Sequence, residues 1–335
     1  MKTIKINNCP ITLAEGFSGY SIFGLKLLFG GKKINHILEY NSPKKDDEVK
    51  ELFNRNRLHV SISGSQEKVS LVLDKHVIRL TKEEERGRYI LKLITPGLDN
   101  AEDVPANEHL TMQIAKQIYN IDTAANALIF FNDGEPAYIT KRFDVTPEGK
   151  KLAVEDFAAL AGKTNAEGGN NSKLDYSYEE LGLLLQKFIP QWMLEVEKFF
   201  SLVLFNYIFS NGDAHLKKFS LIETENGEFV LSPAYGLINT RLHINDNDFA
   251  FRKGLLADDY KSAAYKKQGH ASYLDFMEFA KRIGVNEKRI PNLLDPFREK
   301  KQAVLDITGR SFLTEQSKKS FLQSYFEKLN YLNGE

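Results

Sequence analysis

The chain has 335 residues, 42% of them hydrophobic and 27% charged, enough to bury a sizeable core in one large domain or two lobes. Lysine plus arginine and aspartate plus glutamate both number 45, so the formal net charge is zero. The sequence therefore offers no basic field for nonspecific DNA binding, and we expect no direct contact with nucleic acid. A single cysteine, Cys9, excludes an internal disulfide framework, and the seven histidines lack the paired spacing of a zinc site.

The amino-acid sequence also shows no pattern typical of a membrane span or an export signal. No apolar run reaches the roughly 18 residues that a membrane span needs. The first residues, "MKTIKINNCPIT", show no signal-peptide hydrophobic region. We therefore expect a cytoplasmic protein that does not contact a membrane.

Strand-like runs dominate the chain up to about residue 145. The dipeptide Asp133-Gly134 lies between two of these runs and predicts a tight hairpin. One helix is expected among the strands, over residues 108–120, with Asn107 as its N-cap. The expected strands cover residues 69–74, 76–81, 89–94, 127–131 and 137–143.

Helical periodicity takes over after residue 145, with apolar positions that define one face of each segment. A hairpin over residues 218–232 interrupts the helices, and the polar segment 162–177 predicts a mobile loop. The expected helices cover residues 179–189, 195–209, 272–284, 290–307 and 314–332. A sheet-rich lobe over residues 1–145 and a helical lobe over residues 146–335 give an α+β fold with the two-lobed layout of a protein kinase.

The stretch after the apolar helix 195–209 is the first candidate site. Ser210, Asn211 and Gly212 tolerate left-handed backbone, so they end the helix and start a loop at Asp213. The hairpin that turns at Asn226-Gly227 then returns the chain, which places position 236 near Asp213. Phosphoryl transfer needs a carboxylate beside the attacking hydroxyl and ligands for Mg²⁺. Asn-Gly-Asp is also an ordinary turn, so this stretch alone leaves a purely structural role open.

Two lysines of the sheet lobe are further candidates. Lys68 follows a loop of small residues, and Lys92 is a charged residue within an apolar strand, as phosphate-binding groups would be. Glu108 lies near the start of the expected helix, where an anion is favoured by the helix dipole and could pair with Lys92. A solvent-facing strand lysine and a first-turn helix carboxylate are the alternative interpretations.

Several segments together resemble the HipA-like serine/threonine kinases. The segments "SISGSQEKVSLVL", "YILKL", "NEHLTMQIAKQIY", "ITKRFD", "VEDFA", "SNGDAHLKKFSL" and "LSPAYGLINT" occur in the order and at about the spacing of that family, over roughly residues 55 to 300. The shorter N-terminal part resembles the HipT kinases, toxins of three-part toxin–antitoxin systems. In those systems the N-terminal subdomain of the longer HipA proteins is a separate small protein. The resemblance implies a two-lobed protein-kinase fold.

The resemblance also implies roles for individual residues, with ATP and Mg²⁺ as cofactors. Asp213 would be the catalytic base, and Lys141, Arg142 and Phe143 would form the hinge against adenine, with strand backbone groups reading the base edge. Family members autophosphorylate the phosphate loop, which makes Ser61 and Ser63 the matching positions. The remaining nucleotide-binding positions are Ser63, Gly64, Ser65, Gln66, Glu67 and Lys68 in the phosphate loop, Lys92, and His215, Lys217, Lys218 and Tyr235 around the hairpin.

Two positions depart from the family pattern. Lys218 stands where a magnesium-binding asparagine is expected, and Gly236 stands where the principal magnesium carboxylate is expected. Neither an ammonium group nor a glycine offers the hard oxygen ligand that Mg²⁺ needs, so no metal ligand is predicted and binding of Mg²⁺ is in doubt. Asn239, Asp246 and Asp248 could supply substitute oxygens, but the sequence does not determine where their side chains point.

Three functional hypotheses follow. The first is a HipA/HipT-like kinase fold whose phosphotransfer is weak or absent in this form. The second is an active kinase toxin that phosphorylates a protein, which the resemblance suggests is an aminoacyl-tRNA synthetase. The third is a non-catalytic module of a DNA-bound toxin–antitoxin complex. The resemblance implies a HipS-like small protein and a HipB-like DNA-binding antitoxin as partners.

Overall fold

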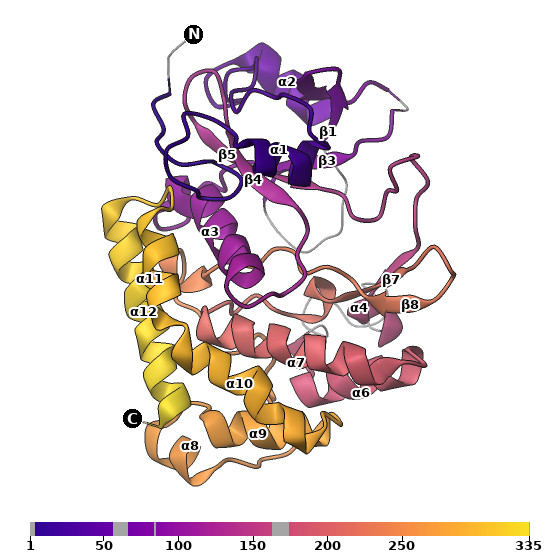
Figure 1. Ribbon diagram of the computed structural model, residues 1–335, viewed down its shortest axis with the longest axis vertical. Helices are drawn as coiled ribbons and strands as arrows, with labels where there is room; N and C mark the ends of the chain where they lie inside the picture. The colour runs from indigo at the N-terminus through magenta and orange to yellow at the C-terminus, as the bar shows by residue number, and fades with distance from the viewer. Residues whose placement is uncertain (1–3, 56–65, 84, 163–173, 335) are drawn as a thin grey trace.

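The computed structural model describes residues 4–55, 66–83, 85–162 and 174–334, and it shows a sheet-rich lobe above a helical lobe (Figure 1). The predicted two-lobed α+β, protein-kinase-like architecture is confirmed. Ser61, Ser63, Gly64, Ser65 and most of the predicted loop 162–177 lie outside the described residues. The expectations for those positions therefore stay predictions.

The upper lobe contains an antiparallel five-stranded sheet in the order β2-β1-β3-β5-β4. All five strands were expected from the sequence, because each alternates or runs apolar between turn residues. Two short helices, α1 (Ile22–Phe29) and α2 (Asp47–Arg55), precede the sheet and were not expected. The strands are β1 (Lys68–Asp74), β2 (Val77–Leu80), β3 (Tyr89–Lys92), β4 (Asn126–Phe130) and β5 (Pro136–Lys141).

The predicted hairpin between β4 and β5 is confirmed. The conformation of its turn explains why the dipeptide Asp133-Gly134 was enough to predict it. Gly134 has a φ of 95°, a left-handed conformation that glycine adopts at little cost, and its N–H donates to the carbonyl oxygen of Phe131 at 2.9 Å. The Asp133 carboxylate accepts a hydrogen bond of 2.9 Å from the Ser42 hydroxyl. This contact ties the turn to the segment that precedes the sheet.

Helix α3 (Val104–Gln117) packs against β4 and β5, but it begins earlier than expected. Pro105 lies in its first turn, where the missing N–H and the restricted φ of proline fit a helix start. The predicted N-cap at Asn107 is therefore wrong. Asn107 is fully buried within the helix, where its amide donates to the carbonyl oxygen of Asn239 at 2.8 Å. The Asn107 side chain, which the sequence suggested would cap the helix, instead makes a hydrogen bond to a residue far away in the chain.

The lower lobe is built around α7 (Trp192–Ile208), most of whose residues are buried, as its apolar composition predicted. The expected helix over residues 290–307 is two helices, α10 (Ile290–Glu299) and α11 (Lys301–Gly309), with Lys300 in a non-helical conformation between them. The other α-helices among the described residues of this lobe are α4 (Phe157–Leu160), α6 (Tyr178–Phe188), α8 (Ala263–Gln268), α9 (Tyr273–Arg282) and α12 (Glu315–Asn333).

A second, three-stranded sheet lies between the lobes, in the order β6-β7-β8. Strands β7 (Ser220–Glu223) and β8 (Phe229–Leu231) form the predicted hairpin, whereas β6 (Val154–Asp156) was too short to predict. After β8, Ala234 exchanges backbone hydrogen bonds with the segment before β4: its N–H donates to Asp122 at 2.8 Å, and its carbonyl accepts from Ala124 at 2.9 Å. These bonds fasten the end of the hairpin to the upper lobe.

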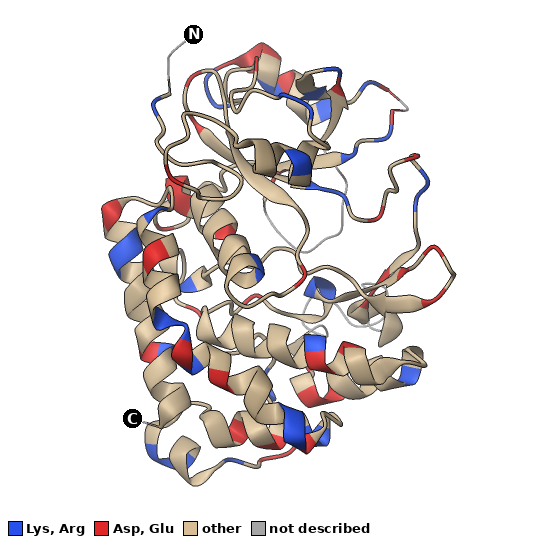
Figure 2. Cartoon of the chain, viewed as in Figure 1, with Lys and Arg blue, Asp and Glu red and all other residues tan. Residues whose placement is uncertain are grey.

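Basic and acidic residues are interspersed over both lobes (Figure 2). Within the part of the chain that the structure describes, no helix is both long and apolar enough to span a membrane.

Candidate functional site

The loop after α7 is held in one conformation by Thr240. Ser210 has a φ of 52°, and its carbonyl oxygen accepts a hydrogen bond of 3.0 Å from the Thr240 hydroxyl. The same hydroxyl accepts the N–H of Gly212 at 3.0 Å. A Cβ at Gly212 would collide with the Asp246 side chain and lie 2.7 Å from the carbonyl oxygen of Asn247. The loop therefore requires glycine directly before Asp213.

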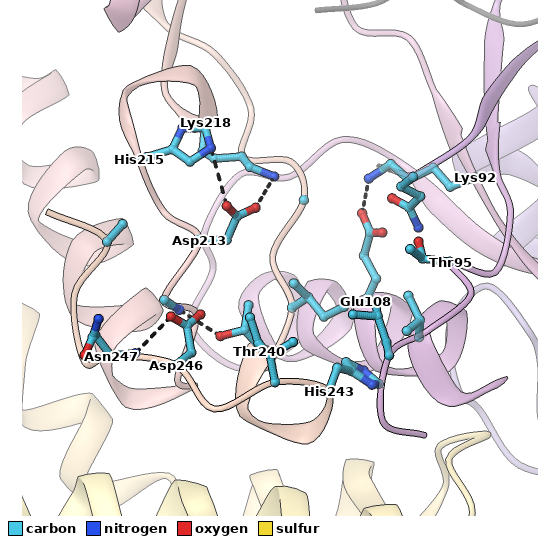
Figure 3. A pocket seen from close by; sticks show the side chains of 18 of the residues that line it. Lys92, Thr95, Glu108, Asp213, His215, Lys218, Thr240, His243, Asp246 and Asn247 are labelled. Atoms are coloured by element: carbon cyan, nitrogen blue, oxygen red, sulfur yellow. Dashed lines mark hydrogen bonds and ion pairs between the residues drawn. The ribbon is translucent and has the colours of Figure 1, made fainter. Parts of the chain in front are cut away.

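Asp213 meets two basic side chains of the same loop (Figure 3). Lys218 Nζ lies 2.7 Å from Oδ2, and His215 Nε2 lies 3.4 Å from Oδ1. The other ring nitrogen of His215, Nδ1, accepts the N–H of Lys217 at 3.2 Å, so Nε2 carries a proton in the neutral imidazole and donates toward Asp213. Both carboxylate oxygens thus have a donor within the loop.

These contacts determine the protonation of Asp213. Burial by itself would raise its pKa, but the Lys218 ammonium and the hydrogen bond from His215 outweigh burial and hold the pKa well below its usual range. The side chain is still 48% exposed, so a second molecule can approach it. A carboxylate with so low a pKa accepts a proton poorly at neutral pH.

Position 236 lies beside this ion pair, as the hairpin predicted. Gly236 has a φ of 66°, and a Cβ built on it would stand 3.7 Å from Lys218 Nζ and 4.0 Å from Lys218 Cδ. The Lys218 ammonium therefore occupies the space between Asp213 and position 236. That space is where the expected asparagine and aspartate would face a cation.

The residues present do not fit Mg²⁺ there. Magnesium needs oxygen ligands in near-octahedral geometry at about 2.0–2.1 Å, and an ammonium group offers none and repels a cation. In the described ranges, no three histidine, cysteine, aspartate or glutamate side chains form a group that could hold a metal ion.

The three proposed substitute oxygens are dispersed. The amide of Asn239 donates to the hydroxyl of Ser324 on α12 at 2.7 Å. The carboxylate of Asp248 pairs with Lys328 and with His270, whose Nδ1 lies 2.6 Å from it. Only Asp246 lines the cavity beside Asp213. The suggestion that Asn239 and Asp248 replace the metal ligands is therefore wrong.

Across the cavity, Lys92 on β3 forms an ion pair with Glu108 on α3, as the sequence suggested (Figure 3). Glu108 is buried, with 4% of its side chain exposed, and Lys92 is mostly buried, with 13% exposed. The Lys92 ammonium lies 5.0 Å from the centre of the Tyr138 ring. The solvent-facing alternative for Lys92 and the simple helix-start role for Glu108 are therefore both wrong.

Lys68 lies directly opposite Lys92 in the pairing of β1 with β3. Burial, together with the charges of Lys92 and Lys218, lowers the pKa of Lys68 to about 8. Three lysines from three separate segments thus face one region, and their mutual repulsion is part of the environment of each.

Two adjoining cavities meet at these lysines. The larger, of about 490 Å³, contains Asp213, Glu108 and Asp246, and the smaller, of about 330 Å³, contains the expected hinge. The larger is also lined by Thr240, the last residue of the segment "LSPAYGLINT", and by His243, which lies outside every motif quoted from the sequence. Four positions line both cavities: Lys68, Lys92, Lys218 and Gly236.

The smaller cavity is strongly basic. Its lining has only two acidic side chains, Asp144 and Asp156. Against them stand six basic side chains, Lys68, Lys92, Lys141, Arg142, Lys217 and Lys218. An anionic ligand is favoured in such a lining, because the excess of positive charge lies within its walls.

The expected hinge lines the smaller cavity as Lys141, Arg142 and Phe143. The Phe143 ring lies 5.7 Å from the ring of Tyr235, whose hydroxyl donates to the carbonyl oxygen of Lys217 at 3.1 Å. The backbone N–H groups of Lys141 and Arg142 donate to the carbonyl oxygens of Ala125 and Arg88. Those two donors are therefore already used within the protein, whereas the Phe143 and Tyr235 rings supply apolar surface.

Other predicted positions are distributed as follows. Gln66 and His215 line the larger cavity and Lys217 the smaller, whereas Glu67 lines neither. The structure therefore brings Asp213 and most of the described nucleotide-binding candidates to one pair of cavities.

Comparisons with known proteins identify the family and the fold. The family model of the HipA-like C-terminal domain matches residues 60–305. A Haemophilus influenzae protein named "Putative kinase" is 27% identical over 97% of this chain and 95% of its own length. A Sinorhizobium fredii protein, "Putative kinase Y4dM", is 31% identical over 63% of this chain and 52% of its own length.

Among solved structures, the chain is similar to HipA of Shewanella oneidensis, determined in complex with HipB and its operator DNA. The TM-score is 0.62 at 18% sequence identity, and the match covers 87% of this chain and 72% of that one. At this identity the likeness establishes the fold.

Proposed function

The chain belongs to the HipA-like C-terminal domain family, and we propose that it is a serine/threonine kinase-fold toxin component with a retained ATP site and weak or absent phosphotransfer. The observation that carries this proposal is the ion pair of Lys218 with Asp213 beside Gly236. Lys218 blocks one oxygen of the expected base, lowers its pKa and takes the place of a metal. The two cavities and the Lys92–Glu108 pair support a retained nucleotide site.

The missing metal ligands imply a large loss of rate. Metal stabilisation of charge in the transition state is worth several kcal/mol, and each ~1.4 kcal/mol is a factor of ten, so the loss reaches roughly a thousandfold or more. Lys218 neutralises phosphate charge, but an ammonium cannot bridge two phosphate oxygens with the geometry that Mg²⁺ imposes.

Restoring both positions tests the proposal. We expect Lys218→Asn combined with Gly236→Asp to gain Mg²⁺-dependent transfer of the γ-phosphate from ATP by at least about a hundredfold. Position 236 accepts the change sterically, since its Cβ meets only Lys218, and aspartate tolerates the left-handed conformation better than most residues.

The matched control is Lys218→Asn with Gly236→Ala, which also places a side chain at the left-handed position but has no carboxylate. Equal activity in the two double variants, or full activity in the unmodified chain, would contradict the proposal. The measurement is radiolabelled phosphate transfer to the chain itself and to a generic protein substrate.

An active kinase is the second candidate, and the buried Lys92–Glu108 pair favours it, because active protein kinases hold such a pair. In that case we expect phosphate on Ser61 or Ser63 in protein purified from cells, and a protein substrate that the HipA resemblance suggests is an aminoacyl-tRNA synthetase. Intact-mass and peptide mass spectrometry decides between the candidates.

A non-catalytic role in a DNA-bound complex is the third candidate. It is supported by the similar fold of Shewanella oneidensis HipA, which was solved with HipB and operator DNA. The neutral net charge fits DNA contacts made by a HipB-like partner rather than by this chain. Co-purification of this chain from the cytoplasmic fraction of cells with a HipB-like or a small HipS-like protein would support this role.

A further inference from the structure

The Lys218 ammonium group is a positive charge in the wall of the cavity. It lies 2.7 Å from Asp213 Oδ2 and faces position 236, where no side chain competes with it. An ammonium group has three N–H donors, and Asp213 takes one of them, so two stay available for a ligand. Lys218 also lines both cavities, so a molecule that extends from one to the other must pass it.

Two more ammonium groups stand at the same junction. Lys92 approaches from β3 with Glu108 as its partner, and Lys68 approaches from the neighbouring strand β1. Among the described residues, no carboxylate forms a direct ion pair with Lys68, although Glu108 and Asp213 are near enough to attract its charge. The repulsion among the three lysines is relieved when a polyanion binds between them.

The two cavities also differ in the chemistry they offer. The smaller one pairs the basic lining with the aromatic surface of Phe143 and Tyr235, which suits an aromatic base and its attached phosphates. The larger one is lined by the carboxylates of Asp213, Glu108 and Asp246 as well as by the three lysines. A phosphate chain is therefore favoured at the junction, where the ammonium groups are concentrated.

We infer that this junction binds a nucleoside triphosphate without a divalent cation, with the Lys218 ammonium in the place of the metal. The inference rests on the proposed nucleotide site and adds how the phosphates are held. Charge-assisted hydrogen bonds to three lysines replace the coordination bonds that a metal would make. A metal-bound triphosphate brings less negative charge to the lysines and a cation that Lys218 repels, so Mg²⁺ should not improve binding.

Isothermal titration of the full chain with ATP tests this, once in EDTA and once in excess Mg²⁺. Adenosine and inorganic tripolyphosphate serve as separate probes of the base pocket and of the lysines. We expect ATP to bind in EDTA at least as tightly as with Mg²⁺. We expect Lys218→Gln to weaken ATP binding in EDTA about tenfold, because one charge-assisted contact is lost, and to leave adenosine binding unchanged.

The matched control is Lys198→Gln on α7. Lys198 Nζ lies 2.7 Å from Glu195, the same separation as in the Lys218–Asp213 pair, but it lines neither of the two cavities. This variant should bind ATP like the unmodified chain. An equal loss in both variants would mean that the effect of Lys218→Gln is a general one of charge, which overturns the inference.

The remaining outcomes separate this inference from the proposed function. ATP binding that requires Mg²⁺ would overturn metal-independent binding and leave the proposed nucleotide site intact. ATP binding in EDTA that Lys218→Gln does not weaken would overturn the role of Lys218. Absence of binding for ATP and adenosine under both conditions would overturn the inference and the proposed nucleotide site together.

Discussion

Two lysine–carboxylate pairs face each other across the same cavity, and their surroundings differ. Lys92 and Glu108 come from the sheet and from α3 of the upper lobe, and their side chains are only 13% and 4% exposed. Lys218 and Asp213 belong to one short loop of the lower lobe, and the Asp213 side chain is 48% exposed. Similar charge pairs therefore stand in different dielectric environments.

The difference separates a structural contribution from a chemical one. A buried pair is strongly coupled to stability, because removing one partner leaves a charge without compensation in a region of low dielectric. An exposed pair contributes little to stability, since water screens both charges. Lys218–Asp213 is thus the pair that could change without loss of the fold, and it is the one that departs from the family pattern.

Breaking the buried pair should give the largest effect on stability. We expect Lys92→Met to lower the free energy of unfolding by roughly 3 to 5 kcal/mol, because the Glu108 carboxylate loses its partner. Urea denaturation followed by circular dichroism measures the change. The double variant Lys92→Met with Glu108→Leu should recover most of the loss. A loss below about 1 kcal/mol in the single variant would mean that the pair is effectively hydrated.

The effect of pH on ligand binding should be intermediate in size. The pKa of Lys68 is lowered to about 8, and a bound phosphate would raise it again, so binding takes up a proton near that pH. Affinity for ATP in EDTA should therefore be highest below about pH 8 and fall by about tenfold between about pH 7 and pH 9.

Lys68→Arg is the control for this pH dependence, because arginine keeps its charge throughout the range. The variant should show only whatever change comes from titration of ATP itself. Calorimetric titrations at several pH values measure both proteins. Identical pH profiles for the variant and the unmodified chain would show that Lys68 does not contact the phosphates.

Breaking the exposed pair should have the smallest effect on stability. Lys218→Met should lower the free energy of unfolding less than Lys92→Met does, because Asp213 keeps its contact with His215 and is half exposed to water. The same urea measurement applies, with Arg55→Met as the reference, because both side chains of the Arg55–Glu51 pair are exposed. A loss as large as that of Lys92→Met would mean that Lys218 holds the loop together.

Local patterns in the sequence were sufficient for most of the fold. The strands on either side of Asp133-Gly134 and of Asn226-Gly227 were predicted because turn chemistry and side-chain alternation act over a few residues. Asn107 was misread for the opposite reason. Its hydrogen bond to residue 239 depends on the packing of two segments far apart in sequence, which no local pattern encodes.

The candidate site divides in the same way. The sequence by itself determined the family, the two-lobed fold, and the lysine and glycine at positions 218 and 236, because these follow from residue identities and spacing. Only the tertiary structure decided where the side chains point. Lys218 forms an ion pair with Asp213, and the Asn239 amide donates a hydrogen bond to Ser324 on α12. Both contacts depend on which partners the folded chain places nearby, because buried polar groups are usually hydrogen-bonded. The contact of the Lys218 ammonium with Asp213 was therefore visible only in three dimensions.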